Sequence, residues 1–326
     1  MAVLIEAERL TKQFGSLKAV DGISLSVPAG EVLGFLGPNG AGKSTTMKMI
    51  SGFLEPDSGR AAISGYDVHQ DPLRARRHLG YLPEGAPAYS EMTPRGYLRF
   101  IAEVRGFRGS DIGRHVDHAV ALTSLAEVLD QPIETLSKGF KRRVGIAQAI
   151  LHDPSVLIMD EPTDGLDPNQ KHQVRELIRE MSAHKAIIVS THILEEVEAV
   201  CSRAVVIARG RIVANGTAEE LMRRSPTHGA VGIKVASRDA DEVRRTLEAF
   251  QTIAKVETLS QANGHIQLRA LPKNGAVIPD GITKALREKN IDVDELFVER
   301  GRLDDVFREI TDESESMSGK KRGRHA

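Results

Sequence analysis

The segment that most constrains this chain is a glycine-rich turn, LGPNGAGKSTT, at residues 36–46. It follows the apolar run Val32 to Leu36 and precedes a stretch from Lys43 to Ser51 that we predict to be helical. Glycine costs conformational entropy on folding, so its concentration here requires a compensating interaction. Backbone N–H groups can surround phosphate oxygens only where no side chain intrudes, and we infer that the compensating interaction is a bound phosphate.

The same segment fits the phosphate-loop pattern G-x-x-x-x-G-K-[ST]. The helix that follows directs its partly positive N-terminus at the same place. Lys43 then supplies a charge for the β- and γ-phosphates, and the Ser44 hydroxyl suits Mg²⁺. The alternative, a plain glycine turn between a strand and a helix, does not account for the lysine and serine. The predicted phosphate-binding residues are Gly37, Pro38, Asn39, Gly40, Ala41, Gly42, Lys43, Ser44 and Thr45.

Two carboxylates end a second apolar run, SVLIMDEP, at Asp160 and Glu161. Consecutive residues of a strand face opposite sides, so the two are expected to do different work. Asp160 suits Mg²⁺, and Glu161 can accept a proton from an attacking water. Acidic residues also end strands as helix caps, an alternative that the phosphate loop upstream makes less attractive.

The apolar runs alternate with amphipathic stretches over the first two thirds of the chain. VLGFLG, VLIMDE and AIIVST are aliphatic on both faces, as in strands buried on both sides of a parallel sheet. Helical stretches such as 170–183 and 194–200 separate them, which predicts an α/β fold. From about Thr93 the pattern is helical without a strong strand, and we predict a helical insertion over about residues 93–150.

A third section begins near Gly229, after the turn-forming RRSPTHG. Its predicted order is strand, helix, strand, strand, helix, strand, which suggests a small ferredoxin-like α+β domain, followed by a helix at 303–310. The predicted domains are therefore 3–228 and 229–311, with a disordered tail at 312–326 that is poor in apolar residues. Its KKRGR cluster could contact acidic lipid, although a solvated tail is the simpler reading. The four strands are predicted at 231–236, 253–260, 264–271 and 293–298, and the two helices between them at 240–250 and 277–289.

Composition narrows the partners and the compartment. The formal net charge of −1, 4% aromatic residues and the absence of Trp argue against nucleic-acid binding. A single cysteine, Cys201, excludes an intrachain disulfide and fits a cytosolic location. No segment approaches the roughly 18 apolar residues that a membrane helix needs. We expect a cytoplasmic protein that another chain holds on the cytoplasmic face of a membrane.

Four motifs in order, GPNGAGKST, LSKGF, VLIMDEPTDGLDP and STH, resemble those of ATP-binding subunits of ABC transporters over roughly residues 3–225. The resemblance implies an ABC-type P-loop fold with an antiparallel β edge. It implies that Ser137, Lys138 and Gly139 contact the ATP of a second copy, that Asp164, Gly165, Leu166 and Asp167 form a dimer contact, and that His192 holds the γ-phosphate and the water. Phe14 corresponds to the aromatic residue that stacks on adenine. Ser137 can independently cap a helix running to about Leu151.

The sequence departs from that family at three positions. Glu84 stands where the family usually has glutamine, and a carboxylate there can still ligate Mg²⁺. Lys138 and Phe140 replace a glycine and a glutamine of the usual signature LSGGQ. Lys138 either adds a cation that faces phosphate or points to solvent, and we slightly favour solvent. GYLPE, LSKGF and STHILEEVEAVC resemble the subgroup that serves type-2 exporters, including gliding-motility ATPases.

The resulting functional prediction is an ATP-hydrolysing subunit that forms a homodimer around two ATP molecules and drives export through a separate multi-spanning permease. The alternative is a soluble ABC-type ATPase acting on ribosomes or DNA ends. Such proteins usually carry two ATPase cassettes or a long coiled coil, and neither is evident in this sequence. A third hypothesis makes the C-terminal domain a regulatory ligand sensor, which its fold alone cannot decide.

Overall fold

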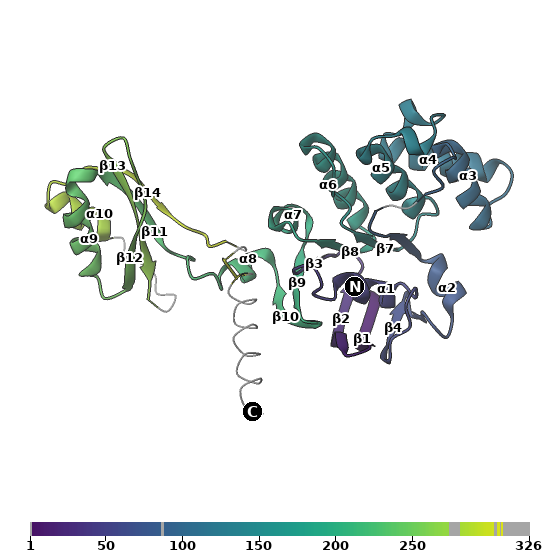
Figure 1. Ribbon diagram of the computed structural model, residues 1–326, viewed down its shortest axis with the longest axis horizontal. Coiled ribbons are helices and arrows are strands. Elements are labelled where there is room, and N and C mark those ends of the chain that lie inside the picture. Colours follow the sequence, from purple (N-terminus) through teal and green to yellow (C-terminus); the bar gives the residue numbers. More distant parts are fainter. Residues whose placement is uncertain (1, 86–87, 274–280, 303–304, 307, 309–326) are drawn as a thin grey trace. The chain divides into compact units, whose positions relative to one another are not determined.

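The computed structural model describes residues 2–85, 88–273, 281–302, 305–306 and 308. The chain divides into two compact units, Met1–Thr217 and Ala218–Ala326 (Figure 1).

A six-stranded sheet organises the first unit. Its order is β10-β9-β3-β8-β7-β6, and all its pairs are parallel except β10 with β9. Every residue of β3, β7 and β8 is buried, which confirms the prediction of strands covered on both faces. The strands are β3 (Val32–Leu36), β6 (Leu79–Leu82), β7 (Val156–Asp160), β8 (Ala186–Thr191), β9 (Arg203–Ala208) and β10 (Arg211–Gly216).

An antiparallel sheet of order β2-β1-β4-β5 forms a second layer of this unit, as the family resemblance implied. Its long strands alternate buried and exposed residues, because one face packs on the core and the other faces solvent. The strands are β1 (Val3–Phe14), β2 (Leu17–Pro28), β4 (Ser58–Ile63) and β5 (Tyr66–Asp67).

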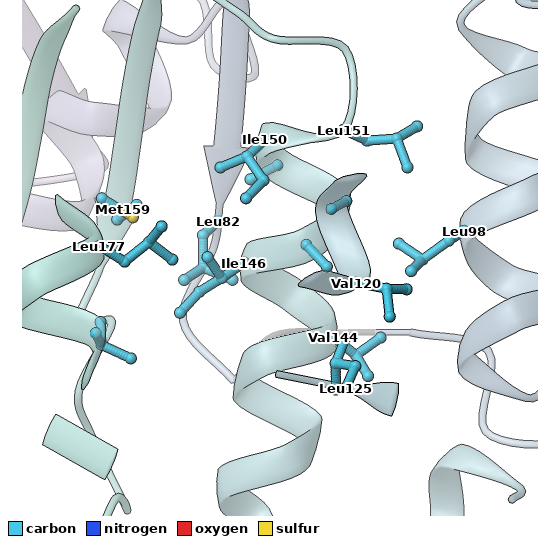
Figure 2. Packing of buried hydrophobic residues seen from close by; sticks show 14 of the residues in the cluster. Leu82, Leu98, Val120, Leu125, Val144, Ile146, Ile150, Leu151, Met159 and Leu177 are labelled. Carbon is cyan, nitrogen blue, oxygen red and sulfur yellow. The ribbon is translucent and has the colours of Figure 1, made fainter. Parts of the chain in front are cut away.

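Side chains of the six-stranded sheet alternate between two separate cores. Leu33, Ile158 and Ile188 join the core shared with β1, β2 and helix α1. Leu157 and Ile187 point the other way, into a core shared with the helices. Figure 2 shows the second core, in which Leu82 meets Ile146 of α5 (Lys138–Ile150) and Leu98 approaches from α3 (Pro94–Val104). Met159 lies beside Leu177 of α6 (Pro168–Ser182) in the same core. Because successive side chains of a strand point to opposite faces, both faces of the sheet are packed against a core.

The predicted helical insertion is present between β6 and β7. Helices α3, α4 and α5 pack against one another through it. α3 begins at Pro94 after the cap Thr93, whose hydroxyl accepts the Gly96 N–H at 3.1 Å. The helices of this unit are α1 (Lys43–Ile50), α2 (Pro72–Arg77), α3 (Pro94–Val104), α4 (Ser110–Thr123), α5 (Lys138–Ile150), α6 (Pro168–Ser182) and α7 (Leu194–Val200), with 3₁₀ turns at Ala126–Val128 and Ile133–Thr135.

The second unit is built on an antiparallel sheet of order β12-β13-β11-β14. Helices α9 and α10 cover one face through residues such as Val243, Leu247 and Leu286. The predicted order of strands and helices from residue 231 to 298 is confirmed, whereas the predicted helix at 303–310 lies largely outside the described residues. The elements are α8 (Ala218–Met222), β11 (Val231–Ala236), a 3₁₀ turn (Ser237–Asp239), α9 (Ala240–Glu248), β12 (Ile253–Ala262), β13 (His265–Pro272), α10 (Gly281–Glu288) and β14 (Val293–Val298).

The division between the units falls at residue 217, eleven residues before the predicted boundary at 228. Local hydrogen bonds explain the difference. The hydroxyls of Ser225 and Thr227 donate to Asp305 Oδ2 at 3.2 and 2.9 Å, and the Gly229 N–H donates to the Glu299 carbonyl at 2.9 Å. The turn-forming segment after α8 is thus tied to the second unit.

No helix within the described parts of the chain combines the length and the apolar character that crossing a membrane requires.

Candidate active site

The predicted site residues of the first unit lie where neighbouring parallel strands end. Strands β3, β8, β7 and β6 are consecutive neighbours and point the same way, so the segments that follow them meet at one edge of the sheet. The phosphate loop follows β3, His192 follows β8, Glu161 follows β7 and Glu84 follows β6. Segments more than a hundred residues apart in sequence are thereby brought together.

The glycines of the phosphate loop meet two different requirements. A Cβ on Gly37 would lie 2.3 Å from the Ile207 carbonyl oxygen, and one on Gly42 would lie 2.5 Å from that of Ala19. These two glycines let the loop pack against β9 and β2. Gly40 has φ +79° and open space around it, so it is the glycine whose absent side chain leaves the outer side of the loop clear.

Lys43 begins α1 and is 6% exposed. Its Nζ donates to the carbonyls of Gly37 at 2.6 Å and Pro38 at 3.2 Å. Burial lowers the pKa of Lys43, while the carboxylates of Glu161, Asp160 and Glu84 favour its charged form. α1 has no side-chain cap, which leaves its first backbone N–H groups available to an anion.

Asp160, the last residue of β7, is 2% exposed. Ser190 is its partner in the register with β8, and the Ser190 hydroxyl donates to Asp160 Oδ1. The same hydroxyl accepts the Glu161 N–H at 3.0 Å. One serine therefore fixes both the first carboxylate and the backbone of the second.

Glu161 follows the strand in a left-handed backbone conformation, with φ +49°. This turn directs its carboxylate to His192, whose Nδ1 lies 2.9 Å from Glu161 Oε1. The two carboxylates thus have different partners, and a turn rather than strand alternation separates them. That they do different work stays a prediction. Left-handed backbone is uncommon for a residue with a side chain and often marks a functional position.

Glu84 is exposed beyond the end of β6, which pairs with β7, the strand that ends at Asp160. Burial, together with the negative charges of Asp160 and Glu84, raises the pKa of the Tyr81 hydroxyl to about 12. The described residues hold no group of three or more His, Cys, Asp or Glu side chains arranged for a metal. The predicted Mg²⁺ ligands, Ser44, Glu84 and Asp160, offer one hydroxyl and two carboxylates, and such hard oxygens suit Mg²⁺ when phosphate oxygens complete the set.

A second cluster joins the residues predicted to serve another copy. Ser137 caps α5 by accepting the Phe140 N–H at 3.3 Å, which confirms the predicted cap. Gly139 packs so closely on α6 that a Cβ would lie 2.4 Å from Gln170 Oε1. The Lys138 side chain is exposed and lies along Gly165. The predicted signature therefore lies beside the DGLD segment, Asp164–Asp167, which follows a different strand.

Asp167 itself caps α6. Its carboxylate accepts the Gln170 N–H at 2.9 Å, and the Gln170 side chain accepts the Asp167 N–H at 3.4 Å, which completes a capping box. Leu166 is buried, whereas Asp164 and Gly165 are exposed. Only part of this segment is thus available to a partner.

Phe14, predicted to stack on adenine, is 49% exposed at the end of β1. It pairs with Leu17 across the turn to β2, and Lys12 Nζ lies 5.9 Å from its ring centre. The same hairpin reaches the phosphate loop two residues later, where the Ala19 carbonyl packs against Gly42.

Comparison with known proteins agrees with this geometry. The sequence profile of the ABC transporter family matches residues 20–164. The linearmycin resistance ATP-binding protein LnrL of Bacillus subtilis is 36% identical over 222 residues, covering 68% of this chain and 71% of that protein. The Nod factor export ATP-binding protein I of Ralstonia nicotianae is 36% identical over 261 residues, covering 78% and 80%. The chain belongs to the family of ABC transporter ATP-binding proteins.

Two further comparisons show how much of each chain the similarity covers. The probable multidrug ABC transporter ATP-binding protein YbhF of Escherichia coli is 37% identical over 223 residues, which are 68% of this chain but only 38% of YbhF. A solved ATP-binding subunit of an ABC transporter, 34% identical, superimposes with a TM-score of 0.63 over 68% of this chain and 92% of that one. The match to solved structures therefore covers the nucleotide-binding cassette rather than the whole chain.

Sequence reasoning missed two side chains that support the cassette's site. Ser190 was visible only as part of STH, and its role depends on the β7–β8 register. Arg142, on α5, is 5% exposed; its Nη1 donates to the Asp160 carbonyl at 3.5 Å, and its Nη2 lies 3.8 Å from Asp164 Oδ2. Burial lowers the pKa of Arg142, while Asp164, Glu161, Asp160 and Glu84 oppose that effect. A basic run, KRR, gives no signal of which residue turns inward.

Proposed function

We propose that this chain is the ATP-binding and ATP-hydrolysing subunit of an ABC exporter. The observation that carries the proposal is the convergence, at one edge of the parallel sheet, of the phosphate loop with the uncapped helix α1, Asp160 and the Glu161–His192 pair. Each of these alone has a structural explanation, but together they supply a phosphate site, a metal carboxylate and a candidate base.

Residues of the loop would bind the triphosphate. Lys43 donates to neutral carbonyls 2.6 and 3.2 Å away, and it can exchange them for phosphate oxygens, which are stronger acceptors because they are charged. The first backbone N–H groups of α1 favour the same anion. We assign Ser44, Asp160 and Glu84 to Mg²⁺, which when bound neutralises charge on the β- and γ-phosphates.

Glu161 would act as the general base. Its carboxylate can accept a proton from the water that attacks the γ-phosphorus, and His192, 2.9 Å away, orients that carboxylate and can donate to the γ-phosphate. The bond from the γ-phosphorus to the bridging oxygen breaks, releasing ADP and phosphate. Catalysis of this kind depends mainly on positioning and charge.

The second cluster supports a homodimer. Ser137, Lys138 and Gly139 form the start of α5, and the Lys138 side chain lies along Gly165 of the DGLD segment. In the proposed pair, this cluster of each copy closes over the triphosphate of the other, with Phe14 stacking on adenine. The arrangement is two-fold, with the same surfaces used by both copies.

A groove in the first unit supports a membrane partner. It has a volume of about 630 Å³ and combines exposed apolar residues, Phe53 and Leu73, with the basic residues Arg76 and Arg77. Tyr81, three residues before Glu84, also lines it. We propose that an amphipathic, acidic helix of a separate permease docks here, so that its movement reaches Glu84 through β6.

Export is the direction we propose, since one relative is named for Nod factor export and another for linearmycin resistance. The cassette would lie on the cytoplasmic face of the membrane and belong to the type-2 exporter subgroup. The strand order β12-β13-β11-β14 supports a ferredoxin-like fold for the second unit, which we propose to be an accessory domain.

The test is ATP turnover by purified protein with Mg²⁺. We expect Glu161→Gln to retain ATP binding, to lose hydrolysis by about 10²-fold or more, and to accumulate as a dimer in size-exclusion chromatography with ATP. Lys43→Ala should weaken nucleotide binding measured by calorimetry. Glu180→Gln, the same substitution at an exposed position on α6, is the control. Hydrolysis by Glu161→Gln at the parental rate would refute the assignment of the base, and co-purification with ribosomes or DNA would favour a soluble ATPase instead.

A further inference from the structure

A buried carboxylate outside the proposed ligand-binding set contacts the two segments that carry Glu161 and His192. Glu196, on α7, is 5% exposed. Its Oε1 accepts the hydroxyl of Thr163, and its Oε2 accepts the hydroxyl of Thr191 at 2.8 Å. Both threonines are buried as well, at 3% and 2% exposed. Burying a carboxylate costs free energy unless it is paired and hydrogen-bonded, so the contacts of Glu196 have to offset its desolvation.

Two cations from α6 balance the charge. Lys171 Nζ lies 3.6 Å and Arg175 Nη2 lies 3.9 Å from Glu196 Oε1. Both cations are partly open to solvent. Their attraction is therefore screened, and the two threonine hydroxyls make the close contacts.

The two threonines are close in sequence to the proposed base and its histidine. Thr163 comes two residues after Glu161, in the loop between β7 and α6, and Thr191 comes immediately before His192, at the end of β8. The Thr191 hydroxyl also accepts the Ile193 N–H at 3.0 Å, so the backbone on both sides of His192 is held. Glu196 thus joins the two segments that carry the proposed base and its histidine.

The backbone of Glu161 needs to be held on both sides. Glu161 has φ +49°, a conformation that persists in a residue with a side chain only where the surroundings over-determine it. The Ser190 hydroxyl holds the backbone of Glu161 from one side. Thr163, fixed by Glu196, holds the loop on the far side of that residue.

We propose that Glu196 is a positioning residue for hydrolysis, and that the Thr163–Glu196–Thr191 bridge sets the spacing of Glu161 and His192. This inference rests on the proposed function, because it assigns Glu196 a role only through those two residues. The bridge acts on turnover rather than on nucleotide binding, since neither threonine nor Glu196 belongs to the phosphate loop.

The experiment compares steady-state ATP hydrolysis and melting temperature across a set of full-length variants. Glu196→Ala should lower kcat by about tenfold to a hundredfold, because small displacements of reacting groups have effects of that size, and it should leave KM for ATP within about twofold. Glu196→Gln can still accept from Thr163 and can donate to Thr191, so it should recover kcat to within about threefold of the parent. Glu195→Ala, the exposed neighbour on the same helix, should match the parent.

A double-mutant cycle separates positioning from general destabilisation. Thr163→Val and Thr191→Val each remove one hydroxyl without changing shape, and each should lower kcat in the parent background. In the Glu196→Ala background, Thr163→Val should change kcat by less than about twofold, because the bridge is already broken. Thr191→Val is left out of the cycle, because it also removes the acceptor of the Ile193 N–H. These two variants also keep the test decisive if Glu196→Ala does not fold.

The outcomes distinguish the two levels of inference. If the parent does not hydrolyse ATP, or Glu161→Gln hydrolyses it at the parental rate, the proposed function fails and the bridge fails with it. If those two behave as expected but Glu196→Ala or both valine variants keep the parental kcat, the bridge alone is refuted. The bridge is also refuted if the losses in kcat multiply in the cycle. It is refuted as well if Glu196→Ala lowers both the melting temperature and kcat and Glu196→Gln recovers neither.

Discussion

Ser190 offers a sharp test of how the site is held together, because one hydroxyl serves two functional residues. It is fully buried, it donates to Asp160 Oδ1, and it accepts the Glu161 N–H at 3.0 Å. Ser190→Ala removes both contacts while preserving the strand. The size of the effect depends on how much each of the two groups loses with the hydroxyl.

The magnitude comes mostly from Asp160. Its carboxylate is 2% exposed, and a hydrogen bond to a charged group contributes about 1.5–3 kcal/mol to the free energy of unfolding. The Glu161 N–H retains the Ser190 carbonyl at 3.2 Å, so the second loss adds little. For a unit of this size, each kcal/mol lowers the melting temperature by about 2–4 °C, which gives a decrease of about 3–12 °C.

Calorimetry and ATP turnover would check this expectation together. Ser182→Ala, which removes a hydroxyl that donates to the Arg179 carbonyl at the end of α6, is the control and should change stability by no more than about 0.5 kcal/mol. We expect kcat to fall in Ser190→Ala alone, since the Glu161 backbone is less constrained. A melting temperature within about 1 °C of the parent, with unchanged kcat, would show that the hydroxyl does not hold the carboxylates.

Further predictions concern stability. Gly37→Ala should destabilise the cassette by more than about 2 kcal/mol in urea unfolding, because its Cβ would lie 2.3 Å from the Ile207 carbonyl oxygen; parental stability would contradict that packing. Gly113→Ala should instead stabilise it by about 0.5–1 kcal/mol, since the residue is inside α4 with open space around it, and a loss of stability would contradict this. Burial, reinforced by the positive charge of Arg105, lowers the pKa of His152 to about 4, so the unfolded chain binds the extra proton first as pH falls. The parent should therefore lose up to about 3 kcal/mol between pH 6.5 and pH 4, and His152→Gln, which retains a donor for the Leu79 carbonyl, should lose less; equal pH profiles would refute this.

The residues that we propose for hydrolysis lie on segments that the sheet fixes at one end and side chains fix at the other. Glu161 leaves β7 and is held by Ser190, and the loop beyond it is held by Thr163. This is the arrangement expected of a preorganised site, in which rigid elements supply precision and loops supply the reacting groups.

Sequence alone was enough to predict the buried parallel strands, the helical insertion and the chemistry that we propose for the site. The apolar runs at β3, β7 and β8 identified buried parallel strands because residues covered on both faces leave no polar alternation. The loop before Lys43 identified a phosphate site because its glycines, lysine and serine are adjacent in the chain. Local patterns of this kind are visible wherever the physical requirement falls on neighbouring residues.

Only the tertiary structure decided which distant residues support that chemistry. Ser190 reaches Asp160 through the register of two strands, Arg142 turns inward from a uniformly basic run, and Glu196 joins two loops from a helix outside both. The same holds for the segment before Gly229, which hydrogen bonds to Asp305 tie to the second unit. Hydrogen bonds between side chains tolerate shifts of only a few tenths of an ångström. Positions to that precision are set by the packing of the whole unit rather than by any local run of residues.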